Sequence, residues 1–546
     1  MLRLPLALLT ALPLLPAPAV AQVSAIAASD LPADPAWRIG TLPTGLTFLI
    51  RANATPAAQG TVQLWIGSGS LAEHDAEQGL AHFIEHMAFN GSTNVPEGDM
   101  VRLLEREGLA FGADTNAATG FEQTLYRLDL PRAEPALLDT ALMLMRETAG
   151  ELTFDPAAVD RERGVVLAEL RTRDTYAARE TADEFAFLYP GARFPHRLPV
   201  GTAEVLRTAT ASELRALWQR LYRPGNAALI VVGDFDPAAV DAAIRVRFAD
   251  WTGDPPAPAP DAGPVPRDLA GLTHLHVDPA LSERVTIVRH GTWAQEPDST
   301  ERRRTRLLRQ IGYAIVNRRL QRIASVENPP FKAAGFGTGE VFGAARSTRL
   351  IVDVVEGGWQ AGLAAAQGEY RRALAQGFSN AELAEQLAQL RTAHVEAAAG
   401  AATRSHASHV ASALALLEDG TVPTTPASAL ARFEAFAPAI TAAAVGAALL
   451  DDAVPLADPL IRWEGRTPPP GGTDALRAAW DAGTAAPLAT AQDDAAGEWA
   501  YAAWGAPGTV IADSIGPLGI RTLTFANGVR VNLKHTDLSA NRISVR

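Results

Sequence analysis

Two histidines and a glutamate lie within one turn of predicted helix, in the order His82, Glu85 and His86. Side chains four residues apart share a helix face, so the two imidazoles are about 6 Å apart and can bind one metal ion. Glu85 faces the same way and can accept a proton from a metal-bound water. The remaining side chains of the turn form an apolar stripe: Leu80, Phe83, Ile84 and Met87. Two solvated histidines on a surface helix are the simpler interpretation, but this H-x-x-E-H spacing arises by chance in roughly one such chain in a hundred.

A third metal ligand is expected from a later helix that begins after Asp155, a favourable N-cap, with Pro156 in the first position. Glu162 and Glu169 fall within the apolar arc of this helix, and a buried carboxylate requires a charged partner, a hydrogen bond, a proton or a metal. They are about 10.5 Å apart along the helix axis, so both cannot bind one ion. One is expected to bind and the other to support it; the alternative is that both pair with arginines on a partly wet face.

Around these motifs, predicted strands alternate with predicted helices. Strand patterns occur at 46–51, 61–66 and 123–130, and a further helix is predicted at 100–107. Because neighbouring strands form hairpin-like pairs, an antiparallel or mixed sheet covered on one side by helices is expected. The predicted fold class is α+β, with two related domains and a fragment of a third.

Composition divides the chain of 546 residues into these domains. Residues 1–21 are a predicted signal peptide ending in Ala-Val-Ala. A catalytic domain is predicted at 35–252, a Pro-rich linker at 253–266, a second, non-catalytic domain of homologous type at 267–464, and a longer linker at 465–520.

The last residues repeat the beginning of the first domain. Residues 525–534 follow the pattern of 42–51, so a third domain is expected to start at 521–546 and to stop after two strands. We therefore interpret the chain as a truncated form of a longer protein. Two strands alone bury little surface, so they are expected to be disordered or to borrow a sheet edge.

Charge and cysteine content exclude several classes of function. The net charge of −13 argues against a nucleic-acid partner, and the absence of cysteine excludes disulfides and thiolate chemistry. After the signal peptide, the sequence contains no stretch of 18 uninterrupted apolar residues, so membrane insertion is not expected. A periplasmic or secreted bacterial protein is expected.

The motif residues resemble a known peptidase family. His82 to His86, Ala88 to Ser92 and Glu162 to Glu169 are similar to the pitrilysin, insulin-degrading-enzyme and mitochondrial-processing-peptidase family of inverted-zinc-motif metallopeptidases, and most of all to its exported bacterial zinc-protease branch. The similarity continues through 198–202, 222–226 and 231–235. The resemblance implies one Zn²⁺ per chain, bound by His82, His86 and Glu169, with Glu162 as the supporting carboxylate.

The same resemblance implies a reaction and a way of holding substrate. Glu85 would act as general base in hydrolysis of peptides or unfolded polypeptides, and Asn116 with Ala117 would hold an extended substrate at a sheet edge. The alternative for Asn116 is a local turn cap. A second hypothesis for the whole chain is a catalytically incomplete half that binds peptide or a partner subunit, with a homo- or heterodimer completing a chamber.

Overall fold

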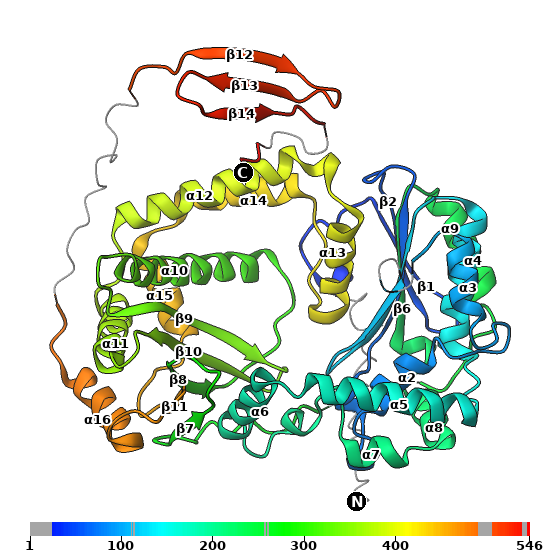
Figure 1. Ribbon diagram of the computed structural model, residues 1–546, viewed down its shortest axis with the longest axis horizontal. Helices are drawn as coiled ribbons and strands as arrows, with labels where there is room; N and C mark the ends of the chain where they lie inside the picture. The colour runs from blue at the N-terminus through cyan, green and yellow to red at the C-terminus, as the bar shows by residue number, and fades with distance from the viewer. Residues whose placement is uncertain are drawn as a thin grey trace, which may run out of the picture.

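The computed structural model describes residues 25–110, 112, 115–255, 258, 261–489, 505–537 and 543–545. The predicted signal peptide lies outside these residues. The described chain forms two helix-covered mixed sheets and a smaller third sheet (Figure 1).

The first sheet has six strands in the order β1-β2-β6-β3-β5-β4. The strands are β1 Trp37–Thr41, β2 Thr47–Ala52, β3 Gly60–Ile66, β4 Thr115–Thr119, β5 Thr124–Leu130 and β6 Ala227–Gly233. Neighbours are antiparallel except β2 and β6, which run parallel. The three predicted strands correspond to β2, β3 and β5. β4 lies at the edge of the sheet.

Helices of the first body pack mainly on one face of this sheet. They are α2 Leu80–Met87, α3 Asp99–Arg106, α4 Pro135–Gly150, α5 Pro156–Arg173, α7 Ala203–Thr208, α8 Ala211–Leu221 and α9 Pro237–Arg247, whereas α6 Tyr176–Leu188 packs against the second sheet. The predicted cap of α5 is present, because the Asp155 carboxylate accepts hydrogen bonds from the N–H groups of Ala157 (2.9 Å) and Ala158 (3.0 Å). On α5, Val159 and Val166 are buried as expected.

The second sheet repeats the topology of the first. Its strands are β7 Thr273–Val277, β8 Arg284–Gly291, β9 Phe331–Val341, β10 Ala345–Val354 and β11 Leu460–Gly465, in the order β7-β11-β8-β10-β9. Taken in chain order, these strands occupy the places of β2 to β6, and β7 with β11 reproduces the single parallel pair. The predicted α+β class with two related domains is therefore confirmed.

The second body contributes α10 Thr300–Ala324, α11 Trp359–Gln376, α12 Asn380–Ala399, α13 His406–Asp419, α14 Pro426–Phe436 and α15 Ala442–Asp452. Helix α13 lies against the first sheet, on the side opposite α4 and α9 (Figure 1). Its Val410 and Leu416 join a buried cluster with Leu49, Trp65 and Ile230 of that sheet. Strands β3 and β6 are consequently buried along their whole length.

The interval 465–520, expected to be a linker, contains regular structure. Helix α16, Gly472–Ala485, packs against α11 and buries Leu476 and Trp480, which are four residues apart on one face. The linker expectation is therefore wrong for these residues. The Gly- and Pro-rich start of the segment suggested a linker, but burial of Leu476 and Trp480 stabilises a packed helix after it. Residues 490–504 of the interval lie outside the described residues.

The third sheet joins β12 Val510–Ile515, β13 Arg521–Phe525 and β14 Arg530–Leu533. The last residues were expected to be disordered or to borrow a sheet edge; β13 and β14 are instead formed, and β13 pairs with β12, whose residues had been assigned to the linker. The repeated turn is also present: Gly45 donates to Leu42 O (2.9 Å) and Gly528 donates to Phe525 O (2.9 Å). Both glycines have positive φ, +100° and +85°, which only glycine adopts readily.

Among the described residues no single helix has the length and apolar character of a membrane span. One bent pair, Pro426–Ala439 and Ala442–Asp452, meets both criteria when its two helices are taken together.

Candidate metal centre

Helices α2 and α5 bring three predicted ligands together. One donor atom from each of His82, His86 and Glu169 lies within 4.8 Å of the other two. The Glu169 carboxylate is 3.6 Å from Nε2 of His82 and 3.2 Å from Nε2 of His86. Zinc bonds of about 2.0–2.2 Å place neighbouring donors roughly 3.3 Å apart in a tetrahedral site. Two imidazole nitrogens and one carboxylate oxygen therefore suit a zinc ion in both type and spacing.

The two glutamates of α5 occupy different places around His86. The Glu162 carboxylate accepts a 2.6 Å hydrogen bond from Nδ1 of His86, on the ring edge that faces away from the cluster. The Glu169 carboxylate faces the other ring nitrogen of His86, Nε2. Arg173, one turn after Glu169, lies 2.5 Å from its Oε1. Val165 between them is 51% exposed, so the carboxylates lie at the border of the buried face of α5. The Glu169–Arg173 spacing was a visible i,i+4 signal that the sequence analysis did not use.

Burial and neighbouring charges set the protonation of the two histidines. Burial, together with the nearby His86, lowers the pKa of His82 to about 4, so its ring is neutral near pH 7. For His86, burial opposes protonation, but the Glu162 hydrogen bond and the surrounding carboxylates raise its pKa. A neutral imidazole is the form that binds metal, and a carboxylate at Nδ1 orients the ring for this purpose.

Glu85 lies one position before His86 and is held by a residue from the first sheet. Thr119, the last residue of β4, donates a 2.5 Å hydrogen bond from Oγ1 to Glu85 Oε2. Burial raises the pKa of Glu85 above its ordinary value, although this hydrogen bond opposes the rise. The sequence analysis missed Thr119. The only sequence feature that could have indicated it was the alternation of side chains along β4, which puts Ala117 and Thr119 on one face.

The two residues expected to hold substrate lie on edge strand β4. Asn116 is exposed, and its Oδ1 accepts a 2.9 Å hydrogen bond from the N–H of Ala117. The side chain therefore makes the local contact that the alternative interpretation required. The position of β4 at the sheet edge leaves room for an added strand.

A buried carboxylate caps the helix that carries both histidines. Glu73 is 0% exposed and accepts hydrogen bonds from the N–H groups of Gly79 (3.0 Å) and Ala81 (2.8 Å) at the start of α2. Burial raises the pKa of Glu73 to about 8, while these two hydrogen bonds and Arg197 oppose the rise. Gly79 itself has no side chain, so the cap has to come from the preceding loop.

Replacing Glu73 by alanine is expected to destabilise the fold by about 1–3 kcal/mol, because two buried N–H groups lose their partner. The measurement is the urea midpoint of the variant. Glu97→Ala is the control: Glu97 pairs with Arg161 at the surface, and exposed pairs contribute at most about 1 kcal/mol. Equal midpoints for the two variants would contradict a capping role.

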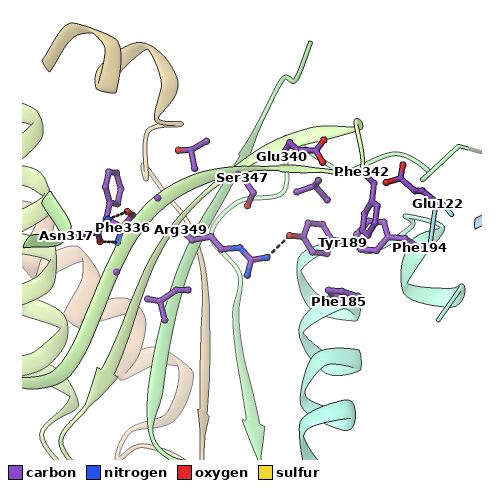
Figure 2. A pocket seen from close by; sticks show the side chains of 16 residues that line it. Glu122, Phe185, Tyr189, Phe194, Asn317, Phe336, Glu340, Phe342, Ser347 and Arg349 are labelled. Carbon is purple, nitrogen blue, oxygen red and sulfur yellow. Dashed lines mark hydrogen bonds between the residues drawn. The ribbon is translucent and has the colours of Figure 1, made fainter. Parts of the chain in front are cut away.

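A cavity of about 650 Å³ lies between α6 and the β9–β10 hairpin, and its lining includes none of the predicted metal-site residues (Figure 2). One wall is aromatic, with Phe185, Tyr189 and Phe194, and Arg349 of β10 donates a 2.6 Å hydrogen bond to the Tyr189 hydroxyl. Glu122, in the turn that follows β4, completes the lining on the side of the first sheet.

Comparison with known families finds matches in two parts of the chain. Residues 49–185, which include the whole cluster, match the insulinase family, peptidase family M16, and residues 208–302 match the peptidase M16 inactive domain. Two related α+β domains, the first bearing a His-His-Glu cluster, define the class of protein to which the chain is similar. Residues 49–185 and 208–302 therefore match two domain types of peptidase family M16.

Individual relatives agree with this assignment. The chain is 37% identical over 212 residues to "Probable zinc protease PqqL" of Haemophilus influenzae. The matched segment covers 39% of this chain and 23% of that protein. "Zinc protease PQQL-like" of Arabidopsis thaliana is 28% identical over 295 residues, covering 54% of this chain and 31% of the relative. The matched parts thus span about a quarter to a third of these relatives.

Solved structures share the fold. The crystal structure of the first half of the periplasmic protease PqqL from Escherichia coli superimposes with a TM-score of 0.77 at 24% identity, covering 85% of this chain and 99% of that one. The structure of the periplasmic protease PqqL from the same organism gives a TM-score of 0.78 and covers 93% of this chain but 56% of that one.

Proposed function

We propose that this chain is an exported zinc-dependent endopeptidase that hydrolyses peptides or unfolded polypeptides. The observation that carries the proposal is the convergence of His82, His86 and Glu169 within 4.8 Å, with Glu85 on the same helix. The names of the relatives, zinc protease and periplasmic protease, agree with this activity and with a periplasmic location.

The roles of the residues follow from their contacts. His82, His86 and Glu169 would hold one zinc ion, which when bound lowers the pKa of water and polarises a peptide carbonyl. Glu85 takes the proton of the attacking water and passes it to the leaving amine. Glu162 orients His86 through Nδ1.

Substrate binding is proposed at the edge of the first sheet. An extended peptide would add a strand beside β4 at Asn116 and Ala117, with main-chain hydrogen bonds that read no particular sequence. Broad specificity for unfolded chains is the consequence. The Asn116 side chain would have to release the N–H of Ala117 when the peptide binds.

The test is hydrolysis of a quenched fluorescent peptide library by the purified chain from Gln22, with the zinc content of each sample recorded. We expect about one zinc per chain, turnover of many sequences, loss of activity with a chelator and its return with added zinc. Bound zinc without turnover would favour the alternative of an incomplete half that needs a second chain. A chain that binds no zinc would contradict the metal site itself.

A further inference from the structure

Thr119 connects the edge of the first sheet to the proposed general base. It is the last residue of β4, it is partly buried, and its hydroxyl donates a 2.5 Å hydrogen bond to Oε2 of Glu85. Hydrogen bonds to a charged carboxylate are stronger than neutral ones and fix its orientation. Oε1 of Glu85 then remains for the proton of the attacking water.

The backbone of Thr119 faces the free edge of the sheet. In the turn after β4, Gly120 donates to Gln123 O at 2.8 Å, which marks a hydrogen-bonded pair of the antiparallel ladder with β5. Such pairs alternate with pairs whose N–H and C=O groups point away from the partner strand. Thr119 and Ala117 lie one and three residues before Gly120, so their backbone N–H and C=O groups point away from β5. The N–H of Ala117 agrees, because its hydrogen bond goes to the Asn116 side chain and not to β5.

One residue thus meets both the incoming peptide and the base. Its N–H and C=O face the edge where a substrate strand would be added, while its side chain holds the carboxylate that activates water. Threonine is β-branched, and its χ1 angle is restricted, so the direction of its hydroxyl follows the backbone of the strand. Pairing of β4 with a substrate strand would fix that backbone.

We propose that Thr119 is a positioning residue that couples strand addition at β4 to the orientation of Glu85; this inference rests on the proposed peptidase function. Thr119 would act through Glu85 and not through the metal ligands. Its loss should lower kcat and leave zinc content and peptide affinity nearly unchanged.

The experiment is a double-mutant cycle with Thr119→Val, which keeps the shape of the side chain and removes the hydroxyl. We expect kcat to fall about 10- to 100-fold in the wild-type background, the scale of a misplaced catalytic group, with KM changed less than about twofold. In the Glu85→Gln background the same substitution should change the residual rate less than about twofold, because the base is already absent. Thr119→Ser, which restores a hydroxyl but lacks the β-branch that restricts χ1, should recover part of the rate.

Zinc content, the urea midpoint and binding of a labelled peptide to the Glu85→Gln forms are measured alongside. Equal kcat for Thr119→Val and the wild type would overturn the positioning role alone. An equal loss in both backgrounds, or no recovery with serine, would also overturn it, because the effect would then bypass Glu85 and the hydroxyl. A wild-type chain that binds zinc but hydrolyses no peptide would overturn the peptidase proposal and this inference with it.

Discussion

A Glu85→Gln variant is expected to bind as much zinc as the wild type and to hydrolyse peptides about 10²- to 10⁴-fold more slowly, the usual contribution of a general base. Glutamine has nearly the shape of glutamate but cannot accept the proton of the attacking water. Glu85 is not one of the three clustered donors, so the metal should stay in place. The Thr119 hydroxyl that donates to Oε2 still finds an amide oxygen as acceptor.

The measurement combines kcat/KM on one peptide from the library with the zinc content of the same protein sample. Glu204→Gln, at an exposed position on α7, makes the same chemical change away from the cluster and should keep the wild-type rate. Full activity of the Glu85→Gln variant would remove Glu85 from the reaction. Simultaneous loss of zinc would instead place its carboxylate among the groups that hold the metal.

The metal helix is the part of the site that could be predicted most directly. His82 and His86 belong to one element, so their spacing determines their relative position before any tertiary contact forms. The cap at Asp155 was also local, and it is present in the structure. Placement of Glu169 beside the imidazoles depends on how α5 packs against α2, and helical periodicity did not distinguish it from Glu162. The resemblance to a family made that choice, and the contacts at Nε2 and Nδ1 agree with it.

Long-range contacts were beyond the sequence analysis. The apolar spacing of α13 predicts a helix with one buried face, but not that this face covers the first sheet rather than the second. His406 and His409 of α13 are buried in that region, and His409 lies edge-on to Trp37. Thr119 gave no signal of its own, because a hydroxyl in a strand acquires a role only when the sheet packs against α2.

The two carboxylates of α5 should respond differently to the same substitution. We expect Glu169→Gln to lose most of its zinc and, with it, all but residual activity, because Glu169 is the only one of the two within 4.8 Å of both imidazole donors. Glu162→Gln should keep zinc but bind it about 10- to 100-fold more weakly, since Glu162 acts through Nδ1 of His86.

This pair of variants is a matched test, because both change a carboxylate to an amide on one helix. The measurement is the zinc content after dialysis against a graded series of chelator concentrations, with the urea midpoint as a check on folding. Glu162 and Glu169 are separated by about two helical turns, so they cannot exchange roles without a rearrangement of α5. Loss of zinc from Glu162→Gln with retention in Glu169→Gln would reverse the assignment, and retention in both would mean that the histidines bind the metal with a ligand outside α5.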